Sequence, residues 1–533
     1  MNRSRWQFAL LPALVGVIGC QHSQLVRLPR QTYVDKCKGA WAGQMVGVCW
    51  GEPYQFQSNG RPITGPIRPW QPQLVAGALR QDDCYVDMAF LRAIETYGLD
   101  LTPAQAGRAF AEPDYALYHA NKYGRENVRK GILPPLSGRP EHNRHADDID
   151  FQIEADVLGI ICPHLPRESN RLCDVFGHIM NYGDGVYGGM FIAGMYTAAF
   201  AEHADVQTLI QTGLACIPRE SEYHKCISDV VRWYRENPGD WLATWHRVEA
   251  KWQDDVDCTP GDPYNIDAKL NGAYVAMGLL YGQGDLLKTL EVSIRCGQDA
   301  DSTAANAGGI VGCLRGYAAL GSHVTGGIAA IAGEPFSHTG YTFDALIPAC
   351  QRTAEAIIRR AGGRVTDDAY LIPRQTPQPP KHLEQWTDQK AILLSPATDQ
   401  RVALWNRQWR VAPVAADAGK GVLPQDYGIT DVLELYPITP ERPAAITAEL
   451  PVPAVEQPKL FLELASDEQR GPFLLKVFVH DRLVREAVID TKCRWTTKTV
   501  IVDPSAQTVS VRVEAHAASG HPTAAYIRRA EIE

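Results

Sequence analysis

Residues 297–309 read GQDADSTAANAGG, a stretch that joins an acidic segment to a run of small residues. Asp299 and Asp301 stand two positions apart, and side chains at that spacing diverge on a helix. We therefore expect both on a loop, with Ser302 or Thr303 beginning the helix behind them. The stretch predicts a small anionic loop at the mouth of a helix.

A second acidic pair lies far upstream. Gln81 is followed by Asp82 and Asp83, directly before an apolar-periodic segment over residues 85–97. A lone Asp-Asp at such a place usually caps a helix. Four aspartates from two helix mouths, however, are costly to gather unless a cation neutralises them. Aspartate carboxylates with a serine hydroxyl form an all-oxygen ligand set, which suits magnesium, manganese or calcium, so we predict a metal site.

Composition limits the class of protein. The chain has 533 residues, 45% of them apolar and 21% charged, which predicts two or three globular domains. A net charge of −9 leaves no basic stripe for a phosphate backbone, so nucleic-acid binding is disfavoured. We expect a small-molecule or glycosyl-conjugate partner, and oligomeric state is left open.

The N-terminus has the pattern of an export signal. Arg3 and Arg5 precede a short apolar run that ends in VIGC at Cys20. Residues 1–20 resemble a bacterial lipoprotein signal with its lipobox, which implies a lipidated Cys20 as the only membrane attachment. An ordinary secretory signal or an uncleaved anchor is the alternative. In each case we expect the protein to act outside the cytoplasm, in the periplasm or at the cell surface.

Residues 31–365 are expected to form one all-α domain. A helix over 35–50 carries Gly39, Gly43 and Gly47 on one face, and Gly308, Gly312 and Gly316 form a matching stripe, so two helices should pack face to face. A capping box with proline starts a helix at Thr102. Further helices are expected over residues 148–161, 169–180, 188–203, 206–216, 221–237, 240–252, 267–281 and 286–295.

The chain changes character after this region. Residues 373–390 are rich in proline and predict a stiff linker, and short alternating segments follow over residues 391–533. Strands are expected over 473–479, 483–489, 499–503 and 509–515. The fold class is therefore multidomain, an all-α domain followed by a C-terminal antiparallel β-sandwich. This last region weakly resembles jelly-roll modules of secreted glycosidases, and a purely structural role is an equal alternative.

Three motifs together resemble the ADP-ribosylglycohydrolase family: GVCWGEPYQF over residues 47–56, QDD over 81–83 and GQDADSTAANAGG over 297–309. The resemblance covers roughly residues 31–345. It implies a compact all-α fold that hydrolyses the glycosidic bond at ribose C1″ of ADP-ribose with two divalent cations, Mg²⁺ or Mn²⁺. Carried over to this chain, Asp82, Asp83, Asp299, Asp301 and Ser302 become metal ligands. We expect the amide oxygen of Gln81 to join this set, and Asp83 and Asp301 to be catalytic as well.

The chain departs from the family at two positions. Gln81 stands where the family usually has threonine or serine, and its amide oxygen reaches a metal differently. Gln55 stands where the family usually has a glutamate, and glutamine cannot accept a proton as a general base. We therefore expect Gln55 to bind substrate rather than to transfer a proton. Glu52 lies three residues away and need not point the same way.

Other polar segments are candidates for the missing groups. Residues 145–150 read HADDID, and Asp148 is expected to bind substrate. Residues 181–189 read NYGDGVYGG, a loop-like segment in which Asp184 is a catalytic candidate and Tyr182 and Tyr187 are substrate-stacking candidates. Helix capping at residue 148 and an ordinary turn at residue 184 are the alternatives.

Together these features predict an exported, metal-dependent hydrolase of a glycosidic bond. Its substrate would be an ADP-ribosyl conjugate, a nucleoside, or a furanosyl or glycan conjugate. Gln55 and Gln81 keep open a second reading, a surface protein that binds a sugar or nucleotide through the same metal site without turnover.

Overall fold

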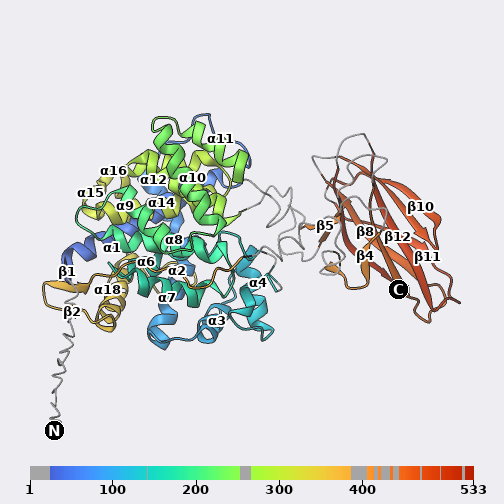
Figure 1. Cartoon of the computed structure of the whole chain (residues 1–533), viewed down its shortest axis with the longest axis horizontal. Helices are drawn as coiled ribbons and strands as arrows, with labels where there is room; N and C mark the ends of the chain where they lie inside the picture. Colours follow the sequence, from blue (N-terminus) through green and yellow to red (C-terminus); the bar gives the residue numbers. More distant parts are fainter. Residues whose placement is uncertain are drawn as a thin grey trace, which may run out of the picture.

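The computed structural model of the chain describes residues 25–140, 142–143, 145–252, 266–385, 402, 405–412, 418–421, 432–435, 443–467, 471–492, 494–518 and 523–533. The predicted signal segment 1–20, with Cys20, lies outside these residues, as does part of the predicted linker, 386–390. Figure 1 shows a region of helices followed along the chain by a region of sheets.

The first region is helical, as the sequence predicts. In its described residues, the 3-10 helices η1 (Glu52–Tyr54), η2 (Pro72–Arg80) and η3 (Leu136–Gly138) interrupt it. The α-helices are α1 (Arg30–Gly51), α2 (Asp82–Tyr97), α3 (Pro103–Ala111), α4 (His119–Arg129), α5 (Asp150–Ile153), α6 (Asp156–Ile160), α7 (Pro166–Gly177), α8 (Asp184–Ala199), α9 (Val206–Ala215), α10 (Glu222–Glu236), α11 (Trp241–Trp252), α12 (Ala268–Gly282), α13 (Leu286–Cys296), α14 (Ala300–Arg315), α15 (Tyr317–Leu320), α16 (Ser322–Thr325), α17 (Ile328–Ile331) and α18 (Phe343–Arg360).

Helices α1 and α14 pack against each other through facing glycines. A Cβ atom added at Gly43 would lie 2.0 Å from the carbonyl oxygen of Gly308, and one added at Gly39 would lie 2.2 Å from that of Gly312. Only glycine permits such an approach of two backbones. The predicted pairing of the two stripes is confirmed at these positions, whereas Gly316 ends α14 with a φ of +79°.

The predicted continuous helix over residues 148–161 is wrong. Two short helices, α5 and α6, replace it, and the break places carboxylates in the interior. Glu154 accepts a hydrogen bond from Asn121 Nδ2, and Asp156 accepts one from Asn306 Nδ2 at 2.7 Å. The periodicity in the sequence failed here because these polar contacts, and not an apolar stripe, determine which residues are buried.

A small sheet joins the two ends of the helical region. Strand β1 (Leu25–Pro29) pairs antiparallel with β3 (Ala369–Pro373), which also pairs with β2 (Arg364–Val365). Pro373, expected at the start of the linker, is therefore the last residue of a strand. The following residues run along the helical region, where Asn170 Nδ2 donates to the carbonyl oxygen of Gln378 at 3.0 Å.

The second region contains two five-stranded sheets in which all pairs are antiparallel. Their orders are β10-β9-β12-β7-β4 and β11-β8-β13-β6-β5, and apolar side chains of both sheets form one core. The expected strand 473–479 is confirmed as β9. The strands are β4 (Trp409–Val411), β5 (Ala418–Gly421), β6 (Val432–Leu435), β7 (Ala444–Pro451), β8 (Lys459–Ser466), β9 (Phe473–Val479), β10 (Arg482–Ile489), β11 (Thr496–Ile501), β12 (Thr508–Ala517) and β13 (Ala525–Ile532).

In the part of the chain that the structure describes, ten cysteines are buried free thiols, which fits a packing role for them. Among the residues that the structure describes, no helix combines the length and apolar character needed to cross a bilayer.

Candidate active site

A cavity of about 560 Å³ lies where helices α2, α4 and α14 begin. Residues of both acidic motifs line it, together with apolar side chains from the segments between them. The polar lining residues include Gln55, Gln81, Asp82, His119, Asn121, Asp150, Asp299 and Ser302. Two motifs more than two hundred positions apart in the sequence therefore share one cavity.

The upstream motif forms the start of α2. Gln81 is the residue before the helix, and Asp82 and Asp83 are its first two residues, whereas the sequence suggested that both precede it. Carboxylates are favoured in the first turn of a helix because the N–H groups there carry partial positive charge. Asp82 lines the cavity, and Asp83 lies behind it, only 1% exposed.

The downstream motif was predicted as a loop, and this is wrong for Asp301. Helix α14 begins at Ala300, so Asp301 and Ser302 lie in its first turn, and Asp299 is the residue before it. Gly297 and Gln298 both have positive φ and turn the chain into the helix. Asp299 has a non-helical ψ of 67°, and burial together with the negative charge of Asp299 raises the pKa of Asp301.

The acidic cluster carries buried negative charge. Burial raises the pKa of Asp83 and of Asp301 well above the usual range, and the neighbouring carboxylates of Asp82 and Asp299 raise both further. Burial, followed by the charge of Asp299, also raises the pKa of Asp82. Oδ1 of Asp83 and Oδ1 of Asp301 are buried without a hydrogen-bond partner among the described residues. These all-oxygen donors fit a hard divalent cation such as Mg²⁺ or Mn²⁺.

Gln55 contacts this cluster directly. It follows the 3-10 helix η1, lines the cavity, and donates a hydrogen bond from Nε2 to Oδ1 of Asp299 at 3.1 Å. The side chain thus holds one of the carboxylates in place. Glu52, the nearest acidic residue in sequence, is exposed.

Asp150 is a further carboxylate of the cavity. Its Oδ1 accepts a hydrogen bond from the backbone N–H of Asn121 at 3.0 Å, and its Oδ2 is buried without a partner among the described residues. Burial and the adjacent charge of Asp148 raise the pKa of Asp150 to about 7. The sequence indicated this residue only as part of the acidic run 145–150.

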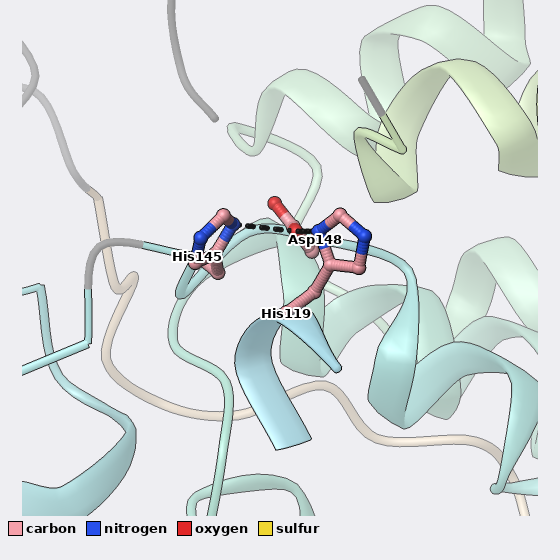
Figure 2. A group of neighbouring side chains, drawn as sticks. All are labelled: His119, His145 and Asp148. Carbon is pink, nitrogen blue, oxygen red and sulfur yellow. Dashed lines mark hydrogen bonds and ion pairs between the residues drawn. The ribbon is translucent and has the colours of Figure 1, made fainter. Parts of the chain in front are cut away.

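Asp148, expected to bind substrate, lies beneath the surface with no side-chain exposure. It accepts contacts from two histidines: Nδ1 of His145 lies 2.9 Å and Nδ1 of His119 lies 3.2 Å from its Oδ2 (Figure 2). It is absent from the cavity lining, which His119 reaches. The sequence did not indicate His119, because it stands 29 positions before Asp148 with no motif around it.

The segment 181–189 is only partly a loop, because helix α8 begins at Asp184. Oδ2 of Asp184 accepts a hydrogen bond from the backbone N–H of Tyr223 at 3.1 Å. The hydroxyl of Tyr187 accepts one from the backbone N–H of Glu384 at 2.6 Å, and the ring of Tyr182 lies under the Arg139 guanidinium. Asp184, Tyr182 and Tyr187 are not among the residues that line the cavity.

Parts of this chain are similar to known proteins. A family profile described as ADP-ribosylglycohydrolase matches residues 29–364. A solved structure described as an ADP-ribosylglycohydrolase-related protein complex is similar over 62% of this chain and 99% of its own, with 15% identity and a TM-score of 0.39. A structure of TmCBM61 in complex with beta-1,4-galactotriose is similar over 24% of this chain and 87% of its own, with 15% identity and a TM-score of 0.17. No curated protein matches the chain.

Proposed function

The chain belongs to the ADP-ribosylglycohydrolase family, and we propose that it is a hydrolase of glycosidic bonds that uses divalent cations held by its aspartates. The observation that carries this proposal is the cavity shared by the two acidic motifs, together with buried oxygens of Asp83 and Asp301 that have no hydrogen-bond partner among the described residues. Burial and the gathering of these carboxylates raise the pKa of Asp82, Asp83 and Asp301, and a bound cation would stabilise their charged forms.

Each acidic motif contributes to the proposed cation site. Asp82, Asp83, Asp299, Asp301 and Ser302 would hold Mg²⁺ or Mn²⁺, with the amide oxygen of Gln81 at the edge of the set. When bound, the cations supply positive charge that polarises a water molecule and orients vicinal hydroxyls of a sugar ring. The chain itself fixes the geometry, because Gln55 restrains Asp299 and the start of each helix restrains its own carboxylates.

Proton transfer needs another group, since Gln55 has no titratable proton. We assign this role to Asp150. Its Oδ1 is anchored by Asn121, its Oδ2 has no partner among the described residues, and it lines the same cavity as Asp82 and Asp299. A carboxylate so placed can exchange a proton with a water or a leaving-group oxygen in the cavity.

The proposal extends to location and substrate. The lipobox-like ending at Cys20 supports export and a lipid anchor. Outside the cytoplasm, the substrate would be an ADP-ribosyl conjugate, a nucleoside, or a furanosyl or glycan conjugate. Their shared feature is an anomeric carbon beside vicinal hydroxyls.

The test is release of product from ADP-ribosyl and from furanosyl substrates by the full chain, with EDTA and after addition of Mn²⁺. We expect turnover only with Mn²⁺ or Mg²⁺, and a loss of at least about 100-fold in Asp83→Asn, because electrostatic stabilisation at the reacting centre is lost. Asp174→Asn, an exposed carboxylate on α7, is the matched control and should keep full activity.

Two results would argue against the enzyme. If EDTA left turnover unchanged, the reaction would not depend on a divalent cation. Tight Mn²⁺-dependent binding of a sugar or nucleotide without any turnover would favour the second candidate, a non-catalytic surface protein. The hydrogen bond from Gln55 to Asp299 speaks for that alternative, since an amide stands where a base is expected.

A further inference from the structure

A second group of potential ligands lies next to the acidic cluster and differs from it in chemistry. His119 stands at the first residue of α4, and His145 and Asp148 lie in the segment before α5. Figure 2 shows both imidazole rings directed at the Asp148 carboxylate from different sides. The two rings are perpendicular, with centroids 5.2 Å apart, so they do not stack on each other.

The donor atoms have the separations of a metal-ligand set. One ring nitrogen of each histidine and a carboxylate oxygen of Asp148 lie within 4.8 Å of one another. The Nδ1 atoms of His145 and His119 lie 2.9 and 3.2 Å from Oδ2 of Asp148. Tetrahedral ligation of zinc with bonds of about 2.0 to 2.2 Å puts neighbouring ligand atoms roughly 3.4 Å apart. A metal ion therefore fits with small movements of the rings.

The surroundings also favour a ligand. Asp148 has no side-chain exposure, and its Oδ1 has no hydrogen-bond partner among the described residues. His119 adopts a positive φ of 41°, a conformation that non-glycine residues rarely hold without compensation. Strain of this kind is retained where a side chain must be held in one direction.

The group has one accessible side. His145 and Asp148 are enclosed, with 5% and 0% of their side chains exposed, whereas 13% of His119 is exposed and it lines the cavity. Zinc sites with three protein ligands keep a further position for water or substrate, and two histidines with one carboxylate are the ligands of such sites and of open iron(II) sites. A metal here would have its free position toward the cavity.

We propose that His119, His145 and Asp148 bind a divalent transition metal of the zinc class, separate from the aspartate site on the same cavity. Imidazole nitrogen selects zinc, cobalt or iron(II) over magnesium, whereas the all-oxygen aspartate cluster has the opposite preference. The cavity thus has one wall for a hard cation and one for a softer cation. This proposal does not depend on the hydrolase activity.

The competing arrangement is a cluster held by hydrogen bonds alone. In that case both rings donate Nδ1–H to the same oxygen of Asp148, while its other oxygen stays buried and without a partner among the described residues. If a metal ion binds both nitrogens, one cation takes the place of the two N–H groups that would otherwise point at the same oxygen. Neither Nδ1 then carries a proton. The two arrangements differ in metal content, which can be measured.

The experiment uses the full chain, stripped with EDTA, dialysed, and kept in excess Mg²⁺ to fill the aspartate site. Titration with Co²⁺ should give a visible ligand-field spectrum that saturates at one equivalent and is abolished by Zn²⁺. His145→Gln and His119→Gln should weaken Co²⁺ binding by more than the roughly 10- to 100-fold that changes outside the ligand shell cause. His323→Gln, at an exposed histidine, should bind as the wild type does.

A measurement on the wild type alone protects the test against a variant that fails to fold. X-ray absorption at the zinc edge should count two nitrogen neighbours of the imidazole type. A shell of oxygen atoms only, or zinc content no higher in the wild type than in a correctly folded His145→Gln, overturns the proposal. Asp83→Asn should keep the Co²⁺ spectrum, so that failure of the hydrolase proposal and failure of this one give different results.

Discussion

Helices α1 and α14 build two regions with opposite requirements. Along their length they touch through Gly39, Gly43, Gly308 and Gly312, where any side chain would collide with backbone. At the end of this contact, a Cβ atom added at Gly51 would lie 2.4 Å from the Cα of Asp301, and there the acidic cluster begins. The helix contact requires positions without a side chain, whereas the acidic cluster gathers several buried carboxylates close together.

The comparison shows how the two depend on each other. Backbones held this close leave little freedom at the start of α14, so Asp301 cannot withdraw to solvent to relieve repulsion. The glycine contact should therefore determine stability, and the carboxylates should determine the response to cations.

The largest effect is expected at the glycine contact. In Gly43→Ala the added Cβ would lie 2.0 Å from the carbonyl oxygen of Gly308, so the helices must separate. We expect a loss of about 3 kcal/mol in the free energy of unfolding, at the upper end of overpacking costs. Denaturant unfolding measures it. Gly333→Ala, where the Cβ meets open space, should change the stability little, and equal losses in both variants would refute the packing argument.

The next effect concerns the charge itself. Wild-type chain in Mn²⁺ at 100 times its dissociation constant should gain about 2.7 kcal/mol of stability, because the cation binds only the folded state. Asp301→Asn should gain almost nothing, since one of the buried oxygens is replaced by an amide. Thermal melts with and without Mn²⁺ measure both. If Asp301→Asn responded to Mn²⁺ as strongly as Asp174→Asn does, the cluster would not be the cation site.

A smaller effect is expected at the edge of the cluster. Gln55→Glu removes the donor to Asp299 and adds a fifth carboxylate nearby. Without divalent cations this should cost about 1 to 3 kcal/mol, the range for an unsatisfied or repelled buried group. With Mn²⁺ the loss should shrink, because a carboxylate is a better cation ligand than an amide. A loss that Mn²⁺ does not reduce would place residue 55 outside the cation's reach.

The smallest effect lies where charge is balanced within the protein. Burial disfavours the charged form of His178, but its hydrogen bond to Glu384 outweighs this and raises the pKa above the usual value. A raised histidine pKa stabilises the fold fully below the unfolded value of about 6.5, and this contribution is lost as the pH rises through the folded-state pKa. His178→Gln should cost about 1 kcal/mol near pH 5.5 and little near pH 9, measured by thermal melts. A loss independent of pH would contradict the ionic origin.

Much of the helical region could be predicted from the sequence because its signals are local. The capping box at Thr102 and the start of α10 after Ser221 each depend on residues within one turn. The pairing of the glycine stripes could be predicted because glycine is costly inside a helix, so its repetition every four residues indicates a close helix contact. Helix α5 and the start of α14 could not be predicted, because tertiary hydrogen bonds and the positive φ of Gln298 fix them.

The site divides in the same way. The motifs around Asp82 and Asp299 are compact in sequence and indicated the cavity that they share. His119 could not be found, because it meets Asp148 only after α4 has been folded against the segment before α5. Asp184 has the composition of a pocket loop, yet its carboxylate contacts the backbone at Tyr223, a contact that only the three-dimensional structure reveals.

The pairing of β1 with β3 has a consequence for biosynthesis. Leu25 emerges from the ribosome before the helical region, whereas its partner Pro373 emerges only after helices α1 to α18 have been made. The first strand must therefore wait, unpaired, through the synthesis of the whole helical region. Completion of this region is consequently a late event, and a chain stopped before β3 would carry an open strand edge available to chaperones or to other chains.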